Sequence, residues 1–130
     1  LAVRAASMKA AEQVAAHIRS LDAQAQVEVM DIEQLDGSQA YELMINATPV
    51  GMYPNVQHSP VDEQALRSVK TLFDCIYNPG TTLLMQQAQQ AGCQTIGGME
   101  MLVWQAAAAQ EIWFGRSFSD CQVAQVAAKM

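Results

Sequence analysis

Apolar residues recur at helical spacing near the start of the chain, after a short apolar opening. Residues 1–3 read as the tail of a strand, and Ser7 then suits the N-cap of a helix that runs to about Ser20. The apolar positions of this helix are Met8, Ala11, Val14, Ala15 and Ile18. Their spacing predicts a helix that packs one face against the rest of the protein.

Short apolar runs separated by polar and glycine-rich or proline-rich stretches follow along the chain. We expect strands at 26–30, 42–47, 71–77 and 94–96, of which 42–47 reads as a buried strand. Residues 31–37 are polar and predict a turn or a single helical turn. Four residues, Pro49, Gly51, Pro54 and Pro60, punctuate residues 48–60 and predict a long loop.

Three further helices are predicted in the second half. Thr81 or Thr82 caps the first, which ends at Gly92, and the second runs from about Met99 to Phe114, where Gly115 stops it. The last covers 120–129. This alternation of strands and helices predicts an α/β fold with a mostly parallel sheet and flanking helices.

Composition narrows the functions that this fold could serve. Hydrophobic residues make up 51% of the 130 residues and charged residues 15%, which is typical of a folded domain. The net charge of −6 disfavours binding to nucleic acid or to an anionic membrane. The chain also lacks a secretory start and any apolar run long enough to cross a bilayer, so a cytoplasmic location is expected.

The cysteines and histidines carry little chemical signal. Cys75, Cys93 and Cys121 are widely spaced and form no CxxC pair, which favours free thiols. His17 and His58 have no carboxylate or serine arranged with them, so surface roles are expected. No metal site is predicted.

Two basic residues follow the opening strand. In dinucleotide-binding folds, an arginine at the end of the second strand accommodates the 2′-phosphate of NADP, where NAD-binding proteins have an acidic residue. Arg4 occupies such a position, and Lys9 lies one turn into the next helix. Ordinary solvated basic residues at a helix start remain the alternative.

Polar residues also follow two of the predicted strands. Ligands of open α/β sheets collect at the carboxyl ends of the strands. The segment Asn46–Met52 follows one strand and combines Asn46 and Thr48 with Gly51, while Tyr77 lies at the carboxyl end of the next. The alternative for Asn46–Met52 is an ordinary turn, and the alternative for Tyr77 is a half-buried aromatic residue of the strand. Asp74 lies within its strand and is interpreted as structural, because a buried carboxylate requires a partner.

Gln105 is a polar residue on the apolar face of the helix that follows Gly97 and Gly98. On a helical projection, five apolar residues fall within roughly 60° of Gln105; they are Met101, Leu102, Ala108, Ala109 and Ile112. An unpaired buried amide costs about 1–3 kcal/mol, so protein backbone or a bound substrate should satisfy it. The paired glycines would also allow close approach to a flat cofactor ring.

Together these segments resemble the shikimate dehydrogenase family, including its quinate/shikimate branch. The resemblance covers roughly residues 43–115 and extends loosely to both ends. The matching pieces are Asn46–Met52, Asp74–Pro79 with Thr82 and Leu84, Gly98–Gln105, Trp113 and Gly115.

The resemblance implies an enzyme that reversibly reduces 3-dehydroshikimate to shikimate with NADPH. It implies that Gln105 and Tyr77 contact the substrate, which is shikimate or quinate. It further implies that the cofactor cleft is lined by Arg4, Lys9, Asn46, Thr48, Gly51, Met52, Gly98 and Met101. The family usually has Asn and Thr on either side of the arginine, where this chain has Val3 and Ala5, so NAD stays open as a cofactor.

The resemblance also bears on domain organisation. Residues 1–130 would be the carboxy-terminal Rossmann-like domain, truncated at its amino end and without its first βα unit, with 119–130 as a terminal helix. The family's catalytic lysine and aspartate lie in an amino-terminal substrate domain, so no catalytic residue is expected here and the chain alone is expected to be inactive. A noncatalytic dinucleotide-binding or regulatory module, a quinate-preferring enzyme and a homodimer are left open.

Overall fold

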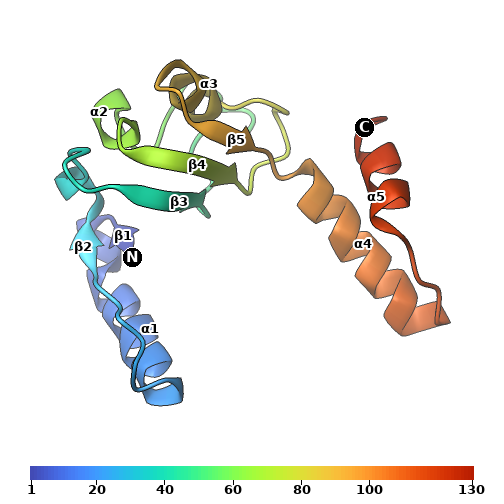
Figure 1. Ribbon diagram of the computed structural model, residues 1–130, viewed down its shortest axis with the longest axis horizontal. Coiled ribbons are helices and arrows are strands. Elements are labelled where there is room, and N and C mark those ends of the chain that lie inside the picture. Colours follow the sequence, from blue (N-terminus) through green and yellow to red (C-terminus); the bar gives the residue numbers. More distant parts are fainter.

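The computed structural model describes residues 1–130 and contains two separate parallel sheets (Figure 1). In the first, β1 (Ala2–Val3) pairs with β2 (Met30–Asp31). The second has the order β3-β4-β5, made of β3 (Tyr41–Asn46), β4 (Val69–Asp74) and β5 (Gln94–Ile96). Every strand pair is parallel, which confirms the predicted α/β class and strand direction.

Helices connect and flank these strands. They are α1 (Met8–Leu21), α2 (Glu63–Leu66), α3 (Leu83–Gln90), α4 (Met99–Phe114) and α5 (Asp120–Ala127), with short 3-10 helices at Ala5–Ser7 and Ile32–Gln34. Thr82 caps α3 by accepting a hydrogen bond from the amide of Met85, as a threonine N-cap does. Helix α2 was not predicted from the sequence, although Asp62 caps it in the same way.

The core lies between the three-stranded sheet and the helices α2 and α3. Leu66, Leu72 and Ala88 have no solvent exposure, and Leu84 is 1% exposed. The remaining core members are Val69, Met85 and Cys93. Because these residues come from two helices and the strands next to them, this part of the chain buries an apolar core of its own.

The prediction of β3 as a buried strand was wrong. Leu43 and Ile45 are 52% and 56% exposed, whereas Met44 packs against the core from the other face. Successive side chains of a strand point to opposite faces, and here only one face is covered by α2 and α3. Figure 1 shows α1 well away from the uncovered face, alongside the β1–β2 pair.

Two other predicted strands have different bounds. The strand expected at 26–30 contains only Met30 in the structure and continues to Asp31, because β1 offers only two residues as partners. The strand expected at 71–77 runs from Val69 to Asp74 instead, so Tyr77 lies in the following loop.

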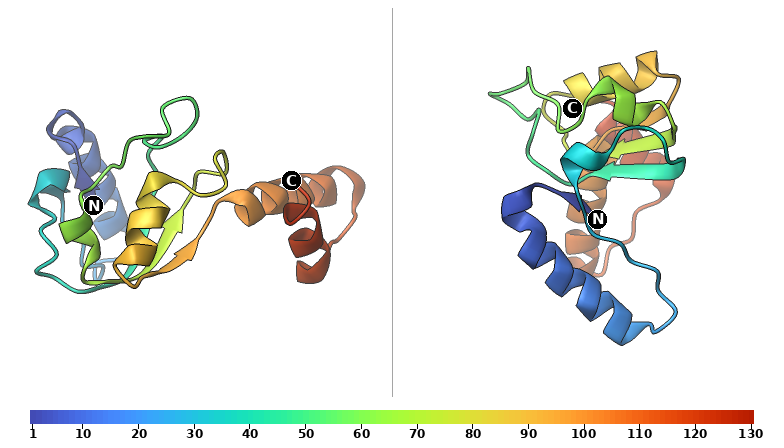
Figure 2. Two further views of the ribbon diagram at one scale, coloured as in Figure 1. Left: turned by 90° about the horizontal axis from the view of Figure 1, so that it is seen from above. Right: turned by 90° about the vertical axis from the view of Figure 1, so that its left-hand side faces the viewer.

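Helices α4 and α5 form an arm that extends from the end of β5 (Figure 2). Helix α4 ends at Gly115, whose φ of 65° is left-handed as expected for a glycine C-cap. No residue of α4 is buried, and α5, which ends two residues before the predicted Lys129, packs against α4 and buries only Val123. None of the helices is both long enough and apolar enough to span a membrane.

Candidate functional site

The carboxyl ends of β3, β4 and β5 meet at one edge of the larger sheet. Parallel pairing sets Asn46 directly opposite Asp74, the last residues of β3 and β4. The loops that follow these strands, together with the turn before α4, therefore gather at this edge. Open α/β sheets bind their ligands at such an edge.

Asp74 is the centre of a buried hydrogen-bond network at this edge. Its side chain has no solvent exposure. Oδ1 accepts hydrogen bonds from Asn46 Nδ2 and from the amide of Ile76, both at 3.1 Å, and Oδ2 accepts one from Thr82 Oγ1 at 2.7 Å. The structural interpretation of Asp74 is confirmed, because three donors replace the water that its carboxylate loses on burial.

Asn46 extends this network into the loop after β3. It is 5% exposed, and its Oδ1 accepts hydrogen bonds from the amide of Thr48 at 3.0 Å and from Thr48 Oγ1 at 2.8 Å. Thr48 Oγ1 in turn accepts one from the amide of Val50 at 3.3 Å. The start of the loop is thus held by side-chain bonds that replace strand pairing.

Gly51 and Gly98 are required by their surroundings. Gly51 has a φ of 96°, and a Cβ there would lie 3.0 Å from the carbonyl oxygen of His58. A Cβ at Gly98 would lie 2.3 Å from the carbonyl oxygen of Cys75, and the Gly98 amide donates to the carbonyl of Ile76 at 3.1 Å. Gly98 therefore packs the start of α4 directly onto the backbone after β4.

The structure brings most of the predicted site residues to this edge, with different exposures. Thr48, Met52 and Tyr77 are exposed, Met101 is half-buried, and Gly98 is buried. The expectation of a buried Gln105 was wrong: its side chain is exposed, because nothing in the chain covers that face of α4. Its assignment to the substrate stays a prediction.

Arg4 and Lys9 lie apart from this edge, on the first sheet and its helix. Arg4 directly follows β1 and is the N-cap residue of the Ala5–Ser7 turn, and both side chains are exposed. Neither forms an ion pair, since the one salt bridge of the chain joins Lys70 to Glu42. A cation at the carboxyl end of a parallel strand and another in the first turn of the next helix, both without acidic partners, fit an anionic group such as a phosphate.

A cavity of about 810 Å³ separates β1 from β3. Its lining is mainly apolar and includes residues 1–3 of the first sheet, residues 43–48 of the second and Leu84. The cavity thus runs from β1, the strand just before Arg4, to Asn46 and Thr48 at the carboxyl edge. It is large enough for a cofactor-sized ligand or for further protein.

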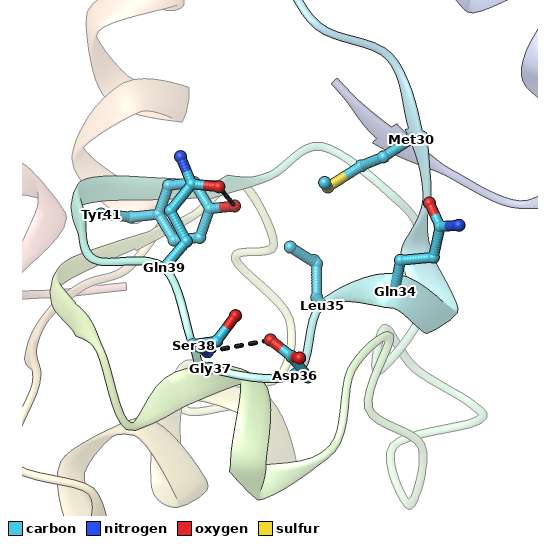
Figure 3. A pocket seen from close by; sticks show the side chains of 8 residues that line it. All are labelled: Met30, Gln34, Leu35, Asp36, Gly37, Ser38, Gln39 and Tyr41. Atoms are coloured by element: carbon cyan, nitrogen blue, oxygen red, sulfur yellow. Dashed lines mark hydrogen bonds between the residues drawn. The ribbon is translucent and has the colours of Figure 1, made fainter.

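A second, smaller pocket of about 100 Å³ lies at the opposite, amino end of β3 (Figure 3). Asp36, Ser38 and Tyr41 line it, and hydrogen bonds from Ser38, the side chain first and then the backbone amide, hold the pKa of Asp36 below its usual value. These side chains belong to no metal-binding cluster, and we propose no function for this pocket.

Metal and thiol chemistry receive no support. No three residues of the metal-binding types lie together, and all three cysteines are free. Cys93 is buried in the core, its thiol donates to the carbonyl of Leu66 at 3.3 Å, and burial raises its pKa. A thiol with a raised pKa is a poor nucleophile at neutral pH.

Sequence reasoning missed the bond between Asn46 and Asp74. Part of the signal was present, because Asn46 was placed at the end of its strand and Asp74 was recognised as a carboxylate within a strand that requires a partner. Register decides whether two such residues meet, however, and register was not assigned from the sequence.

The chain is similar to known proteins over most of its length. The profile of the Shikimate 5'-dehydrogenase C-terminal domain matches residues 98–119. The shikimate dehydrogenase (NADP(+)) of Crocosphaera subtropica is 40% identical over 100 residues, which are 74% of this chain and 35% of that protein. Four such curated relatives are matched over 27% to 35% of their length, so the chain spans about a third of them.

Solved structures agree with the sequence matches. A shikimate dehydrogenase in complex with NADP+ superimposes with a TM-score of 0.79 at 30% identity, over 95% of this chain and 44% of that one. A chorismate mutase/shikimate 5-dehydrogenase fusion protein from Clostridium acetobutylicum gives 0.74 at 32% identity, over 87% and 40%.

The fold and its carboxyl edge define part of a Rossmann-like α/β domain, with parallel sheets and flanking helices. The matches agree on one family for that domain. The chain belongs to the shikimate dehydrogenase family and corresponds to its carboxy-terminal region.

Proposed function

We propose that the chain is the cofactor-binding part of an NADP-dependent shikimate dehydrogenase. Such an enzyme reversibly reduces 3-dehydroshikimate to shikimate, a step of aromatic amino-acid biosynthesis. The observation that carries the proposal is the similarity to the structure of a shikimate dehydrogenase in complex with NADP+ over 95% of the chain.

The nicotinamide end of the cofactor would lie at the carboxyl edge of the larger sheet. Thr48, Met52 and Met101 present side chains there, and the Gly98 contact brings the start of α4 close enough for backbone to line the cleft. These residues would orient the ring and exclude water from one of its faces. The bound cofactor itself supplies the hydride.

The adenosine end would lie at the carboxyl end of β1. Arg4 and Lys9 are exposed and unpaired, so both are free to meet a 2′-phosphate. Recognition of that phosphate would favour NADP over NAD. Replacing Arg4 with glutamine should therefore raise the KM for NADP more than the KM for NAD.

Tyr77 and Gln105 are the proposed substrate contacts. Both side chains are exposed, and each carries a hydrogen-bonding group that suits a polyhydroxylated acid. No acid or base of this chain lies beside them in an arranged cluster. We therefore assign the proton transfer to residues outside these 130, in a substrate domain that would act together with this one.

The test is absorbance at the reduced-nicotinamide band, with the complete protein that carries this sequence. Shikimate and quinate would each be offered with NADP and with NAD. Turnover with shikimate and NADP is the expected result. A folded protein that turns over no pair yet binds NADPH would indicate a noncatalytic dinucleotide-binding module and would reject the proposal.

A further inference from the structure

The Asn46–Asp74 pair is built differently from the rest of the carboxyl edge. Both side chains are buried, at 5% and 0% exposure, whereas Thr48, Met52 and Tyr77 around them are exposed. Every side-chain oxygen of the pair accepts a hydrogen bond from within the chain. The pair therefore has little capacity left to contact a ligand directly.

The bonds of the pair connect three segments that are separate in sequence. Asp74 holds the amide of Ile76 after β4 and the hydroxyl of Thr82 at the start of α3. Asn46 binds Asp74 on one side and Thr48 on the other, and so connects both segments to the loop after β3. A charged acceptor makes stronger hydrogen bonds than a neutral one, and the positive end of α3 lies beside the carboxylate.

Asn46 links Asp74 to the loop by side-chain hydrogen bonds. Its Nδ2 binds Asp74 while its Oδ1 binds both the amide and the hydroxyl of Thr48. The Thr48 hydroxyl then receives the amide of Val50. Loss of the Asn46 side chain would remove two hydrogen bonds to Thr48 and one to Asp74 without changing the exposed surface of the loop.

We propose that Asn46 and Asp74 are positioning residues, which fix the loop 47–52 in the geometry that receives the dinucleotide. This inference rests on the proposed function for the identity of the ligand. It reassigns Asn46 from contacting the cofactor to holding the residues that do. A preorganised loop costs less to order on binding, so the effect should appear in cofactor affinity.

The main variant is Asn46→Ala in the complete protein. We expect the KM for NADP to rise about tenfold while kcat changes less than about twofold, because only binding geometry is lost. The KM for shikimate should stay within about twofold. Hydrogen exchange of the Thr48 and Val50 amides should accelerate at least about tenfold, even without cofactor.

A matched control separates positioning from general stability. Val69 is 6% exposed and lies at the amino end of β4, away from this edge, so Val69→Ala destabilises the core without touching the loop. Its KM for NADP should equal that of the wild type. An equal rise in both variants, or no rise in Asn46→Ala, would overturn the inference.

A charge rearrangement provides a second test. Asn46→Asp keeps the acceptor for Thr48 but sets two carboxylates against each other, so it should raise the KM for NADP. Adding Asp74→Asn removes the repulsion and restores one amide–carboxylate bond. The new amide can no longer accept from the Ile76 amide, so the double variant should recover part of the loss. Failure of this rescue, with both proteins folded, would contradict an action through the pair.

The two proposals can fail separately. If the wild-type protein binds no NADP, the proposed function is rejected, and the exchange rates of Thr48 and Val50 still decide the positioning role. Unchanged exchange in Asn46→Ala would reject that role even in an active enzyme.

Discussion

The sheet region and the α4–α5 arm make opposite use of their apolar residues. In the sheet region, Leu66, Leu72 and Leu84 are almost fully buried between β4, α2 and α3. In the arm, Ile112 and Trp113 are 80% and 69% exposed, and the Trp113 ring lies edge to face with the neighbouring Phe114 at 6.4 Å between ring centroids. One region contains its own core, while the other presents apolar surface that the chain does not cover.

This difference shows which parts of the site the chain can hold by itself. The Asn46–Asp74 network lies on the sheet region and is complete, with each acceptor bonded within the chain. Gln105 lies on the arm and is exposed. Under the proposed function, local packing would thus order the cofactor side of the site, and the substrate side would depend on what meets α4.

The largest contrast should come from truncating one apolar side chain in each region. Leu72→Ala leaves a cavity in a packed core and should lower the free energy of unfolding by about 2–5 kcal/mol. Ile112→Ala removes an exposed side chain and should change it by less than about 0.5 kcal/mol. Denaturant unfolding of each variant measures the two changes in the free energy of unfolding.

The contrast would be broken if Ile112→Ala destabilised the protein as strongly as Leu72→Ala. That result would mean that further protein covers the arm in solution.

Gly98, at the joint between the two regions, should show the next largest effect. Gly98→Ala places a Cβ 2.3 Å from the carbonyl oxygen of Cys75, and relieving this clash should cost about 1–3 kcal/mol. Gly80 is the matched control, because a Cβ there meets nothing within 4 Å. Thermal melts should show a lower melting temperature for Gly98→Ala and an unchanged one for Gly80→Ala. An equal decrease for Gly80→Ala would contradict the claim that the close contact at Gly98 causes the destabilisation.

Among the destabilising changes, the smallest effect is expected within the arm, at the cap of α5. Ser119 Oγ accepts a hydrogen bond from the amide of Gln122, and Gln122 Oε1 accepts one from the amide of Ser119. Ser119→Ala should cost about 1 kcal/mol, measured as lost helicity or faster amide exchange in α5. Exchange in β4 should be unaltered, and a change there would show that arm and sheet unfold together.

Local signals predicted most of the fold. Thr82, Gly98 and Gly115 mark helix ends by capping and conformational rules that depend on few neighbours, and the structure places α3 and α4 close to their predicted positions. The predicted bounds of the strand at 26–30 were wrong because the length of a strand depends on the strand it pairs with, and β1 pairs only two residues.

Burial was predicted less well than secondary structure, for a related reason. Leu43, Ile45 and Gln105 were all expected to be covered and are exposed, because periodicity shows which residues share a face but not whether anything packs on it. Asp74 was interpreted correctly, since a carboxylate inside an apolar strand needs partners wherever they come from.

The most direct test of the central claim is hydrogen exchange of the complete protein with and without NADP. The account predicts protection at residues 46–52, 75–78 and 97–101, with no change at 112–118 or in the pocket around Asp36 and Tyr41. Protection confined to that pocket, or absent from the carboxyl edge despite saturating cofactor, would contradict the account.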